Sequence, residues 1–132
     1  MRKFILIICA CLLIVTSSAH AEFLKDDAGF WYVNSYNNLI FSQGSSFGSA
    51  YDLSSIHIVA NNNSRFEFNV IVLHFRNRDG SITQRNVANF REDYGTGRIF
   101  VNGKTMETYE NFGAGKTRGE IYYKMKSVAL SR

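Results

Sequence analysis

The stretch RFEFNVIVLHFRNRDGSITQRNV, residues Arg65 to Val87, decides the fold. At its centre is Val70-Ile71-Val72-Leu73, the most apolar run that follows the first 21 residues. β-Branched residues lose little freedom in an extended chain and pack well on a pleated surface, so the run predicts a buried strand. Asp79-Gly80 tolerates the positive φ of a tight turn, and Ser81 then begins a return strand. The stretch therefore predicts the central hairpin of a β-sheet.

The two faces of the first strand are expected to differ, because successive side chains point to opposite sides of a sheet. One face carries phenylalanine and valine from Phe66 to Val72, whereas the other is polar as far as Asn69 and apolar from Ile71 onward. Such a strand is typical of the middle of a sheet that is covered on both sides. A two-residue turn would place Arg78 opposite Ser81, Arg76 opposite Thr83 and His74 opposite Arg85.

Outside this hairpin, short runs of aromatic and β-branched residues alternate with turn residues. Asn102-Gly103, inside Arg98–Met106, is the strongest short-range signal for a type I′ turn. Alternation of apolar and polar residues in Glu120–Leu130 predicts a closing strand, and no segment longer than two helical turns shows a 3.6-residue apolar period. Further strands are expected at Phe30–Val33, Leu39–Phe41 and Tyr51–Val59, with turns at Asn34–Asn38 and Asn61–Ser64.

Three segments are expected to be irregular. Glu22–Gly29 is short and acidic and predicts a mobile lead-in, whereas Ser42–Ser49 is small and polar and predicts a flexible loop at the rim. Phe90–Tyr94 is expected to form a helical turn or an irregular link. The many short strands favour an all-β domain, a single antiparallel curved sheet or small barrel-like domain with little helix, over residues 22–132.

The first 21 residues have the three parts of a secretory signal peptide. Arg2 and Lys3 give a positive start, Phe4–Val15 is an unbroken apolar run, and Ala19-His20-Ala21 is a small-x-small cleavage site. The apolar run is shorter than the roughly 20 residues that a membrane-spanning helix needs. We therefore expect residues 1–21 to direct export to the periplasm, the cell surface or the medium, with no transmembrane segment after cleavage.

Both cysteines of the chain, Cys9 and Cys11, lie within this leader. The exported domain is then expected to lack disulfides and thiol chemistry, which is more typical of a bacterial envelope protein than of a disulfide-stapled scaffold. Attachment of a lipid at Cys11 is the alternative, although the apolar run continues beyond it to Val15. Arg2 and Lys3 account for half of the formal net charge of +4. The low charge of the exported domain and its destination both argue against nucleic acid as a partner.

No assembled catalytic, metal or cofactor site is evident in the sequence. Gly113–Thr117 resembles the end of a phosphate-binding loop, but Glu110 occupies the position of its first glycine and a strand is expected to follow. His57 and His74 have no metal-ligand spacing, and no serine lies in a nucleophile-elbow context. We therefore expect no catalytic residues, no metal and no cofactor.

Aromatic residues are the most unusual feature, with eleven phenylalanines, seven tyrosines and one tryptophan. Tyrosine and tryptophan at a surface suit recognition of proteins or carbohydrates, although such residues fill sheet cores equally well. Arginines gather near the turn of the central hairpin, where they could contact a partner. The candidate binding residues are Trp31, Tyr32, Tyr51, Arg76, Arg78 and Arg85.

Three features resemble the small exported domains related to surface-adhesin protein E. They are the aromatic strand at Trp31-Tyr32, the segment YDLSSI from Tyr51 to Ile56, and the long strand after Asn63. The resemblance covers Phe30–Phe75 and implies an antiparallel sheet with an interaction role at the cell surface and no catalytic residues. It also implies later cysteines, which this chain lacks, and a helix where Glu120–Leu130 alternates like a strand.

The sequence thus favours an exported binding protein whose partner is a protein or a glycan at the envelope or cell surface. One alternative is a small envelope enzyme that acts on glycan, with Asp52, His57 and Glu67 as its acid and base groups. Another is a structural assembly subunit that pairs an exposed sheet edge with a partner strand. The oligomeric state is left open.

Overall fold

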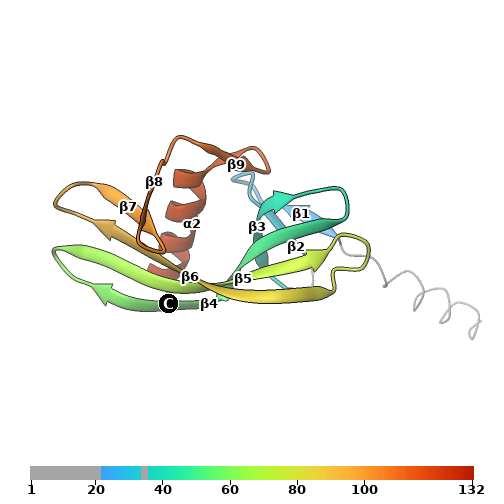
Figure 1. Ribbon diagram of the computed structural model, residues 1–132, viewed down its shortest axis with the longest axis horizontal. Helices are drawn as coiled ribbons and strands as arrows, with labels where there is room; N and C mark the ends of the chain where they lie inside the picture. The colour runs from blue at the N-terminus through green and yellow to red at the C-terminus, as the bar shows by residue number, and fades with distance from the viewer. Residues whose placement is uncertain (1–21, 34–35) are drawn as a thin grey trace, which may run out of the picture.

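The computed structural model describes residues 22–33 and 36–132. It contains one eight-stranded antiparallel sheet in which each strand pairs with its neighbours in the chain, and a helix lies against one face (Figure 1). The sheet is open, because β1 and β8 are its two outer strands and do not pair with each other. The predicted all-β class with a single antiparallel sheet and little helix is confirmed. The predicted leader, residues 1–21, lies outside the described residues.

The strands differ greatly in length, and the longest three are consecutive. The main sheet consists of β1 (Phe23–Lys25), β2 (Trp31–Val33), β3 (Asn38–Gln43), β4 (Phe47–Asn61), β5 (Arg65–Arg76), β6 (Ile82–Asp93), β7 (Arg98–Val101) and β8 (Lys104–Met106). A two-stranded hairpin of β9 (Asn111–Gly113) and β10 (Lys116–Thr117) precedes α2 (Arg118–Leu130).

Strands β4, β5 and β6 form a long ribbon, and the short strands join it at opposite ends (Figure 1). β3 pairs with β4 only along Gly48–Asp52, and β7 pairs with β6 only along Phe90–Asp93. Within the described residues, the outer side of β4 beyond Asp52 and the outer side of β6 before Phe90 therefore have no neighbouring strand. The long ribbon therefore has two lengths of open edge, because the short strands β3 and β7 pair with only part of β4 and β6.

The main core lies between the sheet and α2. Phe66, Phe68 and Val70 of β5 are buried against Tyr122 and Met125 of the helix. The rings of Phe68 and Tyr122 stack with centroids 5.9 Å apart. Full burial of such a side chain contributes about 1.5–3 kcal/mol, so this contact holds the helix on the sheet.

A second, smaller core lies on the opposite face, where Val33, Ile40, Ala50 and Phe75 are buried together. Phe23 of β1 approaches Phe75 of β5 with ring centroids 6.0 Å apart, although three strands separate them in the sheet. Adjacent strands are about 4.8 Å apart, so this contact requires the sheet to curl over itself at this end. The prediction that the second half of the central strand is apolar and covered on both faces is confirmed.

The predicted closing strand at Glu120–Leu130 is wrong, because Arg118–Leu130 is the helix α2. Ile121, Tyr122, Met125 and Ala129 are its buried face, a spacing that follows the 3.6-residue period and that a period of two obscured. Thr117 caps the helix: its side chain accepts the N–H of Glu120, and the Glu120 carboxylate accepts the N–H of Thr117. This capping box is the sequence signal that identifies the helix start.

The predicted register of the central hairpin is also wrong. The N–H of Arg76 donates to the carbonyl of Ser81 at 3.0 Å, so the turn is longer than Asp79-Gly80 alone. His74 lies opposite Gln84 and Phe75 opposite Ile82, which leaves Thr83 as an extra, bulged residue. A bulge shifts every later pairing by one, and Arg85 therefore pairs with Leu73, on the face opposite His74.

The predictions of three irregular segments are wrong, because each segment contributes residues to a paired strand. Ser42–Ser49 is mostly strand, because the N–H of Gly44 donates to the carbonyl of Phe47 and closes a short turn between β3 and β4. Glu22–Gly29 contains β1, and Phe90–Tyr94 includes the end of β6. The type I′ turn is confirmed, with φ of 51° at Asn102 and 81° at Gly103, and Asn61–Ser64 is a turn. The predicted turn Asn34–Asn38 lies partly outside the described residues.

Candidate binding site

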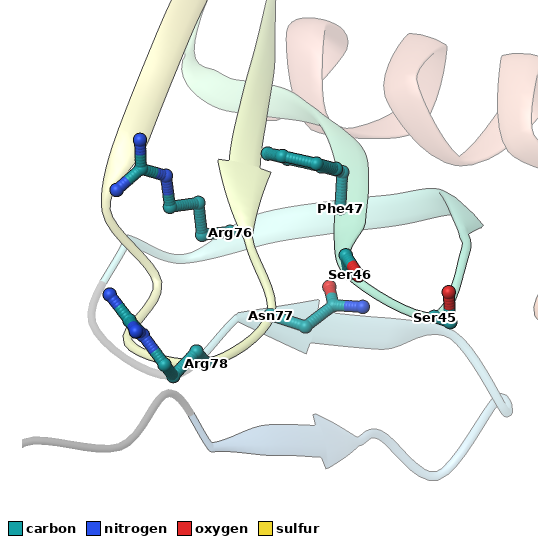
Figure 2. A pocket seen from close by; sticks show the side chains of 6 residues that line it. All are labelled: Ser45, Ser46, Phe47, Arg76, Asn77 and Arg78. Carbon is teal, nitrogen blue, oxygen red and sulfur yellow. The ribbon is translucent and has the colours of Figure 1, made fainter.

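A groove of about 600 Å³ lies where the turn between β5 and β6 meets the turn between β3 and β4 (Figure 2). One wall comes from the end of β5 and its turn, and the other comes from the start of β4. No lining residue is acidic. The groove is lined by Ser45, Ser46, Phe47, Arg76, Asn77 and Arg78.

Asn77 ties the two turns together. Its backbone N–H donates to the carbonyl of Ser46 at 2.9 Å, and its side-chain Nδ2 donates to the carbonyl of Gly44 at 2.6 Å. Gly48 is required beneath this contact, because a Cβ there would lie 2.6 Å from Phe75 Cζ and 3.1 Å from Asn77 Oδ1. The shape of the groove thus depends on the second core directly below it.

The groove combines two cations with an exposed aromatic ring. Phe47 pairs with Arg76 across β4 and β5, so their side chains lie on the same face, and Phe47 is 58% exposed. Figure 2 shows the guanidinium groups of Arg76 and Arg78 pointing to the same side, away from Ser45. Guanidinium forks match the geometry of carboxylate, sulfate and phosphate groups. The arrangement can therefore bind an acidic group beside an apolar surface.

Asp79 is the acidic residue in the same turn, and its carboxylate accepts a hydrogen bond within that turn. Its Oδ1 accepts the N–H of Ser81 at 2.9 Å, and this hydrogen bond lowers the pKa of the carboxyl. The charge of Asp79 therefore persists to low pH and reduces, without cancelling, the positive charge of the two arginines beside it.

A row of hydrogen-bonded polar side chains continues from the groove along the same face. Ser49 Oγ lies 2.6 Å from His74 Nδ1, and Asn86 Nδ2 lies 3.2 Å from His74 Nε2. Asn86 Oδ1 accepts from Gln84 Nε2 at 3.3 Å, which orients the amide with its nitrogen toward the histidine. The two ring nitrogens of His74 can each donate or accept, depending on the tautomer, and the histidine thereby links Ser49 of β4 to Asn86 of β6.

Of the six candidate binding residues, only Arg76 and Arg78 line the groove. Arg85 is exposed on β6 but lies on the opposite face of the sheet, because of the bulge at Thr83. Tyr51 is buried and stacks on Phe41 with centroids 4.4 Å apart, so its assignment to a binding surface is wrong. Burial raises the pKa of the Tyr51 hydroxyl, as expected for a core residue.

The other two aromatic candidates have structural contacts away from the groove. Trp31 packs against the second core, with Lys25 Nζ 5.5 Å from its ring. Tyr32 donates its hydroxyl to Asp26 Oδ2 at 3.2 Å, and the same oxygen accepts from Lys124 Nζ at 3.3 Å. Sequence reasoning missed Phe47, which only the pairing of β4 with β5 brings beside Arg76, and Asn77, whose role depends on its contacts with the turn between β3 and β4.

Two of the residues of the enzyme alternative, Asp52 and Glu67, form hydrogen bonds to nearby side chains. Asp52 Oδ1 accepts the hydroxyl of Ser54 at 2.6 Å inside a bulge of β4, so it shapes the backbone there. Glu67 accepts from Arg65 Nε at 3.0 Å and from an asparagine of β6. His57 pairs across β4 and β5 with another asparagine. Among the described residues there is no group of three or more His, Cys, Asp or Glu side chains that could hold a metal ion.

The glycine-rich segment Gly113–Thr117 is followed by a helix, so the expectation of a strand after it is wrong. The helix start is nevertheless filled by its own capping box, since Glu120 Oε2 accepts the N–H of Thr117 at 2.8 Å. Lys116 Nζ donates to the carbonyl of Ala28 at 2.8 Å and lies over the ring of Phe30. The segment is therefore a packed turn with no phosphate cradle.

The fold and the groove together define the structural class of this domain. It is an open antiparallel sheet covered by one helix, and a groove lined by two arginines and an aromatic residue lies at the tip of a hairpin. Comparisons with family models, with curated proteins and with solved structures find no match to the chain. The resemblance to surface-adhesin protein E stays a prediction. No helix in the described part of the chain is long and apolar enough to cross a membrane.

Proposed function

We propose that this is an exported, non-catalytic binding protein that captures an acidic group of a protein or glycan partner in the groove at the tip of the β5–β6 hairpin. The partner lies at the envelope or cell surface, and binding requires no cofactor. The proposed signal peptide, residues 1–21, supplies the route out of the cytoplasm.

The observation that carries this proposal is the meeting of Arg76, Arg78 and the exposed Phe47 in one groove with no acidic lining residue. A hydrogen bond to a charged group contributes about 1.5–3 kcal/mol when it is well formed. The ring of Phe47 offers apolar contact to a sugar ring or an aliphatic side chain beside the acid. Two arginines and one aromatic ring thus supply both charge recognition and contact area.

The test is a calorimetric titration of the purified exported domain with two acidic polymers, polygalacturonate and polyglutamate. The double variant R76A/R78A is compared with R98A/K104A, which removes two exposed cations from β7 and β8 at the other end of the sheet (Figure 1). We expect the groove variant to lose about tenfold or more in affinity for at least one polymer, equivalent to about 1.4 kcal/mol, and the control to remain within about twofold.

Salt provides the second arm of this test. Exposed charges are screened over about 8 Å at physiological ionic strength, so wild-type affinity should fall as salt is added. Equal loss in the two double variants would mean that binding follows net charge alone, and the groove assignment would then be wrong.

A further inference from the structure

The outer edge of β6 between Ile82 and Ala88 is an open length of sheet, and its side chains from Thr83 to Val87 are all exposed. Asn89 marks the point where this edge becomes covered. Its N–H donates to Asn102 Oδ1 at 2.9 Å and its carbonyl accepts the N–H of Asn102 at 2.8 Å, so both backbone groups of Asn89 point outward. Backbone groups alternate in direction along a strand, so Val87 and Arg85 also present their N–H and C=O outward.

The other edges of the sheet are covered or short. Arg132 donates its guanidinium to the carbonyls of Leu53, Ser54 and Ile56, which covers the first part of the open side of β4, and register shifts between Asp52 and His57 and between Ile58 and Ala60 interrupt that strand. The outer strands β1 and β8 have three residues each and carry a lysine. Lysine and short length are the usual means by which an edge strand avoids pairing. Between Ile82 and Ala88, β6 thus keeps an open edge that neither a neighbouring strand nor Arg132 covers.

We propose that an extended, acidic segment of a partner protein pairs with β6 along Ile82–Ala88 and places a carboxylate against Arg85 and another near the groove arginines. This inference rests on the proposed function and narrows its partner from protein or glycan to a peptide segment, because an extended peptide presents N–H and C=O groups at the repeat that a strand edge requires.

Charge complementarity selects an acidic segment. Arg85 projects from the edge itself, and Arg76 and Arg78 lie at the end of β5 and in the turn that leads to β6. A strand rises about 3.3 Å per residue, so a segment paired along Ile82–Ala88 extends about 20 Å and ends near this turn. Val87, which is 66% exposed, gives the segment an apolar neighbour next to Arg85 on the same face.

The experiment uses a blocked peptide of about nine residues, with adjacent glutamate pairs between valines and threonine at both ends, so that carboxylates point to both faces of the added strand and the length suffices for the open edge. Its matched control carries lysine in place of glutamate. Amide hydrogen exchange is followed by NMR in the wild-type domain. We expect the acidic peptide to slow exchange at Arg85 and Val87 by about tenfold or more, and the lysine peptide to leave it unchanged.

Two variants separate pairing from charge. V87P removes the outward N–H at a position where an edge strand tolerates proline, and it should abolish peptide binding while near-ultraviolet circular dichroism stays native. R85E should weaken binding about tenfold, and K104E, the same charge change on β8, should not. If V87P does not fold, the exchange measurement on the wild-type domain decides.

Several results would overturn the inference. Failure of the acidic peptide to protect Arg85 and Val87, or unaltered binding in folded V87P, would exclude edge pairing. Loss of polymer binding in R76A/R78A together with such a result would leave the proposed function standing and remove only the inference. Protection of Val87 that rises with protein concentration and without peptide would assign the edge to a second copy of this chain instead.

Discussion

Replacement of Gly48 by alanine is expected to destabilise the domain, because the new methyl group would overlap the ring of Phe75. The distances from the Cβ position are 2.6 Å to Phe75 Cζ and 2.8 Å to Phe75 Cε2. Phe75 is only 1% exposed and packs against the ring of Phe23, so it has little room to move aside. Asn77, which ties the two turns of the groove, lies on the other side of the same position.

The size of the effect follows from two opposing contributions. Alanine gains about 0.5–1 kcal/mol over glycine in an extended strand, because glycine loses more freedom on folding. Overpacking of a well-filled core costs about 1–3 kcal/mol. The free energy of unfolding should therefore fall by about 1–2 kcal/mol in G48A, so the sign of the change itself reports the clash.

The assay is urea unfolding followed by the fluorescence of Trp31, the only tryptophan of the chain, which packs against this second core. F75L provides the matched partner variant, because the smaller side chain makes room for the new methyl group. F75L alone should cost about 1 kcal/mol, and the G48A/F75L double variant should be about 1 kcal/mol more stable than additivity predicts. An additive double variant, or a G48A domain that is more stable than wild type, would refute the packing argument.

Three further predictions concern the helix and its contacts. Y122F removes the buried hydrogen bond of 2.9 Å to Glu92 and should lower the free energy of unfolding by about 1.5–3 kcal/mol in urea, whereas a change below 0.5 kcal/mol would contradict the role of this bond. T117A removes the helix cap and should cost about 1 kcal/mol, measured as a lower midpoint of urea unfolding; an unchanged midpoint would argue against the cap. Asp26 is partly desolvated, which raises the pKa of its carboxyl, but hydrogen bonds led by the N–H of Phe30 outweigh this and leave the pKa lowered. The Asp26 carboxylate should therefore stabilise the domain above the unfolded pKa near 3.8, and this stabilisation should be lost as pH falls through the lower folded pKa. Over this pH range, the free energy of unfolding should fall less in D26N than in the wild-type domain.

Much of the β architecture follows from local sequence. The largely β-branched run of Val70–Leu73 and the turn residues Asn102-Gly103 each act through neighbours in the chain, so the central strand and the second hairpin are predictable. The helix was also encoded locally, by the capping box of Thr117 and by the spacing of its buried residues. It was missed because Ile121, Tyr123 and Met125 alternate with polar or charged neighbours often enough to mimic a strand.

The candidate site was less predictable, because it depends on pairings between distant segments. The arginines near the turn could be singled out from their positions, but the bulge at Thr83 moves Arg85 to the other face. Phe47 reaches Arg76 only through the register of β4 against β5, and Tyr51 is taken into the core by the same register. Non-local pairing of this kind leaves no signal in a single sequence.

The most direct test of the central claim is NMR observation of the arginine side-chain Nε–Hε groups during titration with the acidic probes. Arg65, Arg91 and Arg118 serve as internal references, since they contact Glu67, Phe100 and Phe112 respectively. If the groove binds the acid, the signals of Arg76 and Arg78 shift and saturate together while the three references stay fixed. Uniform small shifts of all arginines, or shifts confined to the references, would contradict the assignment of the groove as the binding site.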